Sequence, residues 1–319
     1  MIEADRQALL GELGEEAEVR FDEPMARHTT LRIGGPVDAW VAPRTIEALR
    51  RLRAFCSARQ IPQRAFGAGS NLLVRDGGVR GVAISLRHLN AVSLIEPAGE
   101  HGENLRIEAG AATGRVLALA TRHGLGGVEF LGGVPGTVGG GLVMNAGTYL
   151  GEWKDVVVHV TSIDAQGERV ARSNAECGFG YRTSRLPPDE VVIEATARLA
   201  PRDRGAIEAD VRALRDRRRD REPHAVPNNG STFKNPPGDF AGRLIEAAGL
   251  KGRRIGGAEV SPVHANWLVN ADGASARDLL ALIELVRREV AQKFGITLEL
   301  EVKVVGEDVE NANPRETSR

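Results

Sequence analysis

The 319-residue sequence is poor in cysteine, containing only Cys56 and Cys177. Two cysteines cannot form a disulfide framework or a cysteine-rich zinc site, and so low a content suits a reducing compartment. The seven histidines form no H-x-x-x-H or Cys/His cluster, the kind of spacing that brings metal ligands together. We therefore predict no structural metal site.

An excess of charge of one sign and long apolar runs are also missing. The net charge is −1 and the isoelectric point is about 6.7, so bulk electrostatics give no reason to expect nucleic acid or an anionic membrane as a partner. No run approaches the ~18 apolar residues that span a bilayer. Residues 1–20 lack the basic and apolar regions of a signal peptide. We expect a cytoplasmic monomer.

Glycine is abundant and concentrated in residues 126–147, GGVEFLGGVPGTVGGGLVMNAG. Glycine is kept where a positive φ is needed or where the backbone closely approaches a ligand or a neighbouring chain. Successive backbone N–H groups in such turns can bind anions, and Thr137 adds a hydroxyl donor. The stretch lacks the GK[ST] of a P-loop, and the turn at Pro135 replaces a G-x-G-x-x-G turn. A diphosphate loop and a tight packing crossover both remain open.

A second glycine loop, FGAGSNLLV, occupies residues 66–74. A Rossmann fingerprint would lead into an amphipathic helix, whereas Leu72-Leu73-Val74 followed by RDGG is typical of a strand and a turn. Two phosphate-type loops outside a Rossmann unit indicate a different cofactor fold.

Apolar periodicity predicts helices over residues 7–13, 45–59, 113–123, 205–221, 239–249 and 275–294. Thr45, Asp239 and Ser275 are the predicted N-caps. Strands are predicted over residues 28–36, 72–74, 79–89, 105–109, 155–164, 191–199 and 298–305, and a short strand is predicted just before the glycine loop at Gly67. The composition shifts after Pro201, and the chain from Glu307 is polar and expected to be disordered.

Long segments spread over residues 28–307 resemble the UDP-N-acetylenolpyruvoylglucosamine reductases, flavoenzymes of bacterial cell-wall synthesis. They are, in chain order, GAGSNLLV, EFLGGVPGTVGGGLVMNAGTYLGE, CGFGYRTSRL, NNGSTFKNP, AGLKG, GGAEVSPVHANWLVN and LELEVKVVGE. Because several are long and all follow the order of the family, chance convergence is a poor explanation.

The resemblance implies an α+β chain in which a vanillyl-alcohol-oxidase-like FAD-binding domain of two subdomains precedes an α+β C-terminal substrate-binding domain. It assigns an N-terminal extension to residues 1–27, the two FAD-binding subdomains to 28–88 and 89–202, the C-terminal domain to 203–306 and a disordered tail to 307–319. Such a fold accounts for paired glycine loops without a Rossmann unit.

The resemblance also implies an activity. Family members bind FAD non-covalently, reduce it with NADPH as co-substrate, and pass the hydride from flavin N5 to UDP-N-acetyl-3-O-(1-carboxyvinyl)-glucosamine. The product, UDP-N-acetylmuramate, is a precursor of peptidoglycan and so serves cell shape and division. Hydride addition at C3 of the enolpyruvyl group generates an enolate, so the site needs stabilisation of that charge and a proton donor to C2.

Three positions match the catalytic residues of the family. Arg182, in CGFGYR, would clamp the substrate carboxylate and the developing enolate. Ser231, in NNGSTFKNP, would deliver the proton to C2, and Glu301, in LELEVKVVGE, would complete the polarising set. Outside the family context these residues would more often be a turn serine, a surface arginine and a solvated glutamate.

Binding residues follow from the same resemblance. FAD is assigned to Gly67, Ala68, Gly69, Ser70, Asn71, Leu72, Gly133, Pro135, Gly136, Thr137, Gly140 and Asn145. The UDP diphosphate is assigned to Arg221, Asn235 and Asn266. The segment between Arg182 and Ser231 is too short for the substrate-covering tyrosine loop of longer members, which indicates the shorter class. The roles of Asn229 and Thr232 stay open.

Two other functions also remain open. Another FAD oxidoreductase of the same domain type, acting on a hydroxy acid or an alcohol, would be expected to lack NNGSTFKNP and LELEVKVVGE. A non-catalytic nucleotide-sugar binding protein would keep the loops for ligand capture alone. Such a protein would bind UDP-sugar without flavin.

Overall fold

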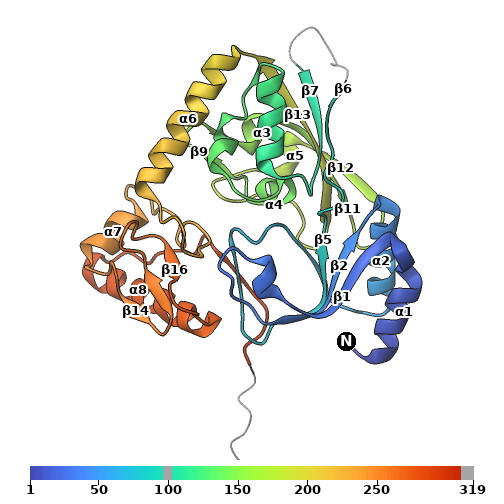
Figure 1. Cartoon of the computed structure of the whole chain (residues 1–319), viewed down its shortest axis with the longest axis horizontal. Helices are drawn as coiled ribbons and strands as arrows, with labels where there is room; N and C mark the ends of the chain where they lie inside the picture. The colour runs from blue at the N-terminus through green and yellow to red at the C-terminus, as the bar shows by residue number, and fades with distance from the viewer. Residues whose placement is uncertain (96–102, 310–319) are drawn as a thin grey trace, which may run out of the picture. The chain divides into compact units, whose positions relative to one another are not determined.

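The computed structural model describes residues 1–95 and 103–309 and divides them between two compact units (Figure 1). The first unit comprises Met1–Phe21, Ala39–Ser70 and Gly81–His224, and the second comprises Asp22–Asp38, Asn71–Arg80 and the chain from Ala225 onward. Each unit has its own cluster of buried apolar side chains. The predicted domain boundaries stay predictions, and the predicted tail lies outside the described residues from position 310.

The first unit contains a six-stranded antiparallel sheet in the order β12-β11-β13-β7-β6, with β8 paired to β13. Its strands are β6 (Val92–Ile95), β7 (Glu103–Glu108), β8 (Leu125–Gly126), β11 (Val157–Ile163), β12 (Arg169–Ser173) and β13 (Val191–Pro201). Alternate residues from Ile193 to Leu199 are buried, because one face of the strand packs on the core. The predicted strand over residues 191–199 is confirmed.

Helices complete the first unit: α1 (Glu3–Leu13), α2 (Ile46–Ala58), α3 (Thr113–Arg122), α4 (Val138–Val143), α5 (Asn174–Cys177) and α6 (Arg204–Arg221). Thr45 caps α2 as predicted, since its hydroxyl accepts from the Ala48 N–H at 3.0 Å. Leu9 and Leu13 of α1 are buried in the core, so this helix is an integral part of the unit.

Part of the glycine-rich stretch serves packing. Helix α6 lies against the 3₁₀ helix η3 (Glu129–Gly133). A Cβ added at Gly132 would lie 3.0 Å from Val211, and one added at Gly133 would lie 2.8 Å from Nη1 of Arg218. The packing interpretation therefore holds for this end of the stretch.

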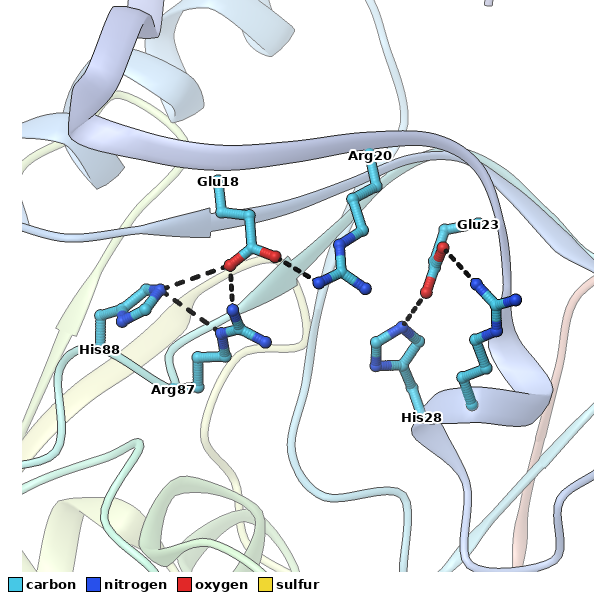
Figure 2. A network of polar contacts seen from close by, with 7 residues as sticks. Glu18, Arg20, Glu23, His28, Arg87 and His88 are labelled. Atoms are coloured by element: carbon cyan, nitrogen blue, oxygen red, sulfur yellow. Dashed lines mark hydrogen bonds and ion pairs between the residues drawn. The ribbon is translucent and has the colours of Figure 1, made fainter.

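A further sheet has the order β1-β2-β5-β3, formed by β1 (Ala17–Pro24), β2 (Pro36–Pro43), β5 (Val79–Ser85) and β3 (Gln63–Phe66). Two glutamates of β1 each bind basic side chains (Figure 2). In the first unit, Glu18 pairs with Arg20 at 2.6 Å and with Arg87. In the second unit, buried Glu23 lies 3.0 Å from Nε2 of His28. These pairs fix the polar side chains along β1.

The second unit packs α7 (Ala241–Ala247) and α8 (Ala276–Phe294) with the sheet of β14 (Arg254–Ile255), β15 (Ala258–Val260) and β16 (Leu268–Asn270). Ser275 caps α8 in a capping box with Asp278, as predicted. The Asp76 carboxylate also accepts from the Ala276 and Arg277 N–H groups at 2.8 and 2.9 Å. The start of α8 is thus capped a second time by a residue 200 positions earlier.

Strands β4 (Leu72–Val74) and β17 (Lys303–Val305) pair in parallel in the second unit. The predicted strand over residues 298–305 is wrong in extent, because the Glu301 and Val302 N–H groups both turn to the Thr232 carbonyl, at 2.9 and 3.3 Å. The main chain of Glu307 exchanges hydrogen bonds of 2.9 Å with Gly77 and Gly78. Ordered chain therefore continues past the predicted start of the tail.

The predicted strand over residues 28–36 is also wrong. Residues Met25–His28 form a 3₁₀ helix, and the Thr29 hydroxyl then donates to the Ile33 carbonyl at 2.9 Å across a turn in which Arg32 has φ 55°. Leu31 and Ile33 are both buried in the core of the second unit. Their alternation with polar residues comes from this turn, and the strand β2 begins only at Pro36.

Within residues 1–95 and 103–309, no helix combines the length and the apolar character needed to cross a membrane. The same residues contain no group of three or more His, Cys, Asp or Glu side chains placed to hold a metal ion.

A partly buried ion pair of the first unit makes stability depend on pH. Arg172 holds Glu190 in a bidentate pair of 2.6 and 2.6 Å, and the Ser162 hydroxyl also donates to Glu190. Burial alone would raise the pKa of Glu190, but these donors hold the pKa below its ordinary value. A carboxyl group whose pKa is lowered by folding stabilises the fold above its unfolded pKa, and this contribution is lost as the pH falls through the folded pKa.

We therefore expect Glu190→Gln to lower the free energy of unfolding by about 1.5–3 kcal/mol at neutral pH, the value of hydrogen bonds to a charged group. The difference from the wild type should shrink as the pH falls below about 4. Urea unfolding at a series of pH values measures it. Glu168→Gln, at a carboxylate that is 70% exposed and pairs with Arg50, is the control. A Glu190→Gln difference that stays constant down to acid pH would contradict the expectation.

Candidate active site

The two glycine loops meet in the first unit. Ser70, in the loop after β3, donates to the Pro135 carbonyl at 3.3 Å. A Cβ added at Gly67 would lie 2.6 Å from Oγ1 of Thr137, and one added at Gly136, where φ is 117°, would lie 2.9 Å from Oγ of Ser70. Only glycine permits this approach, so the structure brings together loops that lie far apart in the sequence.

These loops fit a dinucleotide cofactor. Gly67, Ala68, Pro135 and Gly140 are exposed, so loop backbone remains accessible where the side chains are small. The Ser70 and Thr137 hydroxyls add donors of the kind that a diphosphate binds. The Val138 and Gly139 N–H groups at the start of α4 donate to carbonyls of the fold, so the loops and hydroxyls are the better candidates for phosphate contacts.

Arg182 lies in the first unit at the tip of a tight turn. Gly180 and Thr183 exchange backbone hydrogen bonds of 3.0 and 3.3 Å, and Arg182 between them has φ 55°. This is a left-handed conformation that side-chain-bearing residues rarely adopt. The guanidinium donates to the Gly147 carbonyl at 3.2 Å and stacks 5.2 Å from the centre of the Tyr181 ring. Backbone strain of this kind is common at functional sites.

Asn145, predicted to bind FAD, anchors this turn. It is fully buried, its Nδ2 donates to the Gly180 carbonyl at 3.0 Å, and its Oδ1 accepts from the Lys154 N–H at 3.0 Å. Asn145 itself has φ 44°. Its side chain thus ties the glycine-rich stretch to the turn that carries Arg182, a role that sequence reasoning missed.

Ser231 and Glu301 lie in the second unit, and the fold brings their segments together. The residue after Ser231, Thr232, is buried, and its carbonyl accepts from the Glu301 N–H at 2.9 Å. The next residues along, Phe233 and Leu300, form an antiparallel bridge. Two segments some 70 positions apart in the sequence are therefore adjacent: Glu301 makes one of these contacts itself, and Ser231 directly precedes its partner Thr232.

Asn266, predicted to bind the diphosphate, is buried and holds the Ser231 segment. Its Oδ1 accepts from the Phe233 N–H at 3.0 Å, and its Nδ2 donates to the Phe233 carbonyl at 2.8 Å. The Asn266 N–H donates to Nδ1 of His264 at 3.2 Å. Burial, and then the charge of Lys251, lowers the pKa of His264, which favours the neutral ring that can accept this bond.

Asn229, two residues before Ser231, is an exception to the rule that buried polar groups are paired. It is 3% exposed, and neither side-chain polar atom has a hydrogen-bond partner within the part of the chain that the structure describes. Leaving a buried polar atom unsatisfied costs about 1–3 kcal/mol, so such atoms in a native fold call for an explanation. Its place beside Ser231 makes the amide a candidate contact for a ligand or a water molecule.

The remaining predicted diphosphate residues lie in different units. Arg221 is the exposed last residue of α6 in the first unit. Asn235 is exposed in the second unit, and its Oδ1 accepts from the Ala241 N–H at 3.1 Å.

The prediction that Asp239 caps helix α7 is wrong, because the N-cap is Phe240. The Asp239 carboxylate instead binds Nε of Arg243 at 2.6 Å.

Two family models match the chain. Residues 37–172 match an FAD binding domain, and residues 222–305 match the UDP-N-acetylenolpyruvoylglucosamine reductase C-terminal domain. Together with the paired glycine loops, these matches define a flavoprotein in which an FAD-binding domain of the vanillyl-alcohol-oxidase type precedes a distinct C-terminal domain. The predicted fold class is confirmed.

Whole-chain relatives specify the family. The UDP-N-acetylenolpyruvoylglucosamine reductase of Anaeromyxobacter dehalogenans is 49% identical over 288 residues, 90% of this chain and 85% of the relative. The enzyme of that name from Moorella thermoacetica is 46% identical over 305 residues, 95% and 99% of the two chains. The crystal structure of the Thermus caldophilus reductase (MurB) aligns with TM-score 0.76 at 35% identity, over 90% and 98% of the two chains. The chain belongs to the UDP-N-acetylenolpyruvoylglucosamine reductase family, and its length fits the shorter class.

Proposed function

We propose that the chain catalyses the NADPH-dependent reduction of UDP-N-acetyl-3-O-(1-carboxyvinyl)-glucosamine to UDP-N-acetylmuramate in peptidoglycan precursor synthesis. The observation that carries this proposal is the match of residues 222–305 to the reductase C-terminal domain in a chain that also has an FAD binding domain. Other FAD oxidoreductases would share only the second of these. We also propose that the protein acts in the cytoplasm as a monomer.

Bound FAD would supply the redox chemistry, as the carrier of the hydride between NADPH and the enolpyruvyl group. In this proposal the Gly67–Ser70 loop and the Pro135–Thr137 turn hold the cofactor diphosphate, because small side chains leave their backbone accessible and two hydroxyls can donate. Of the other assigned cofactor residues, Gly133 is buried against α6 and Leu72 pairs with Lys303, so their contacts to the cofactor would be made by the main chain.

Three side chains would act on the substrate. Arg182 binds the carboxylate through its planar guanidinium and stabilises the negative charge that develops there. Ser231 donates a proton to C2 as the enolate collapses. Glu301 completes the polar surroundings of the carboxyl group, and the hydrogen bond from its N–H to Thr232 supports a place for it beside Ser231.

For the diphosphate of UDP we propose Arg221 and Asn235, a guanidinium and an amide donor. Asn235 would use Nδ2 for this contact, since its Oδ1 accepts from the start of α7. We propose that Asn266 contributes indirectly, because both ends of its amide bind the Phe233 main chain.

The purified protein is expected to be yellow, to bleach on addition of NADPH without oxygen, and to regain colour when the enolpyruvyl substrate is added. Acid denaturation should release all of the flavin, because the loops hold it without a covalent bond. Absorbance spectra before and after each addition test these steps. Colourless protein that binds UDP-sugar and cannot be reconstituted with FAD would favour a non-catalytic binding protein.

A further inference from the structure

The main chain of Glu301 is held from both sides within the second unit. Its N–H donates to the Thr232 carbonyl at 2.9 Å, and its carbonyl accepts from Nδ2 of Asn71 at 3.1 Å. One of these partners follows Ser231 directly, and the other directly follows the glycine loop Gly67–Ser70. The peptide groups on either side of the Glu301 side chain are therefore fixed by different parts of the chain.

Asn71 binds this segment twice. Besides the contact from its side chain, its carbonyl accepts from the Lys303 N–H at 3.1 Å. The parallel pairing of β4 with β17 begins at the next residue, with Leu72 opposite Lys303. The bonds from Asn71 to residues 301 and 303 fix the register of this segment beside β4. They also fix the orientation of the peptide group after Glu301.

This orientation matters because the Glu301 side chain leaves the main chain between two fixed peptide groups, next to a bend at Val302. Leu298 and Val302 are buried, whereas Glu301 is partly exposed between them. A rotation of the peptide group after Glu301 would change the direction of its Cα–Cβ bond. A displacement of about 1 Å in a catalytic group can lower the rate by about 100-fold.

We propose that Asn71 is a positioning residue for Glu301, a role that rests on the proposed function and differs from the flavin contact assigned to Asn71 by resemblance. Its amide acts through the Glu301 main chain and touches neither substrate nor reacting atoms in this role. The residue that ends the flavin loop thus also sets the place of a carboxylate needed only when the enolpyruvyl group is reduced.

The test measures the two half-reactions of the full-length FAD-loaded protein by stopped flow. Asn71→Asp keeps the size of the side chain but replaces the donor with a charged acceptor. Asn71→Ala removes the amide without adding charge. FAD content and the rate of flavin reduction by NADPH are measured on each variant, because the resemblance also assigns Asn71 to the flavin, and any change in them should be smaller than the change in reoxidation. Flavin reoxidation by the enolpyruvyl substrate should slow by about 10–100-fold.

A double-mutant cycle distinguishes positioning from general structural damage. If Asn71 acts through Glu301, Asn71→Asp should have little further effect on reoxidation in a Glu301→Gln background, because coupled residues are not additive. Asn270→Asp is the matched control: it removes another amide-to-carbonyl bond of the second unit, from Nδ2 of Asn270 to the Leu31 carbonyl at 3.0 Å, and keeps an oxygen that can accept from the Ala274 N–H. Its effect should be the same in both backgrounds.

Three results would overturn the inference. Loss of FAD together with slow flavin reduction would make Asn71 a cofactor ligand. Additive effects of Asn71→Asp and Glu301→Gln would exclude action through Glu301. Normal reoxidation in both Asn71 variants would remove the residue from the reaction. Failure of the wild type to turn over the substrate would instead overturn the proposed function, and the inference with it.

Discussion

Ser231→Ala is expected to leave flavin reduction by NADPH near normal and to slow reoxidation by the enolpyruvyl substrate by about 10²–10⁴-fold, the usual contribution of a positioned general acid. The loss corresponds to about 3–5 kcal/mol of transition-state stabilisation. The two half-reactions should respond differently because only the second delivers a proton to carbon. Stopped-flow absorbance of the flavin measures both rates on one preparation.

The surroundings of Ser231 make this variant informative. Thr232 and Asn266 hold the adjacent main chain through their own bonds, none of which uses the Ser231 hydroxyl, so the substitution should leave the fold intact. Ser57→Ala, at an exposed position of α2, is the control and should change neither rate. Ser231→Cys offers a group of lower pKa and should recover part of the lost rate. Equal slowing of both half-reactions by Ser231→Ala would indicate damage to the fold, and unchanged reoxidation would exclude Ser231 as the proton donor.

Arg182→Ala should slow reoxidation by about 10²–10³-fold, as expected for the loss of one group that stabilises a developing oxyanion. Flavin reduction by NADPH involves no such charge and should change little. Arg182→Lys keeps a positive charge but loses the planar two-nitrogen geometry that matches a carboxylate, so it should recover only part of the rate. Arg212→Ala, at an exposed arginine of α6, is the control for loss of charge.

Because Arg182 has a positive φ, two substitutions can separate the loss of its side-chain chemistry from any effect on the stability of the fold. Alanine has the same difficulty with this conformation as arginine, whereas glycine adopts it freely. Arg182→Gly should therefore be at least as stable as Arg182→Ala in urea unfolding and equally impaired in reoxidation. An Arg182→Ala variant impaired only in flavin reduction would assign the residue to the NADPH step and contradict its proposed role.

Local chemistry explains what could be predicted from the sequence. Thr45 and Ser275 cap helices because their hydroxyls accept from N–H groups a few residues away. Buried and exposed residues alternate along β13 because only one face of the strand packs on the core. The strand β2 was not predicted, because both of its faces are buried. It is buried from Val37 to Pro43, and such a strand shows an apolar run in place of alternation.

The organisation of the site was harder to predict, because it depends on contacts between distant residues. Resemblance assigned Asn71, Asn145 and Asn266 to ligands, because they match positions at which the family binds the cofactor or the substrate. Their carbonyl partners are main-chain atoms, and any residue type can supply a carbonyl. No pattern in the sequence marks such a partner when it lies 230 positions away, as Glu301 does from Asn71.

The pairing of β4 with β17 has a consequence for biosynthesis. A ribosome adding about 5–20 residues each second would need roughly 10–50 s to make the chain between Asn71 and Glu301. During that time β4 lacks its parallel partner, and the apolar side chain of Leu73, which ends fully buried, has only part of its core. A nascent chain halted at α6 should therefore be cut by protease within residues 71–80, and release of the full-length chain should protect that segment.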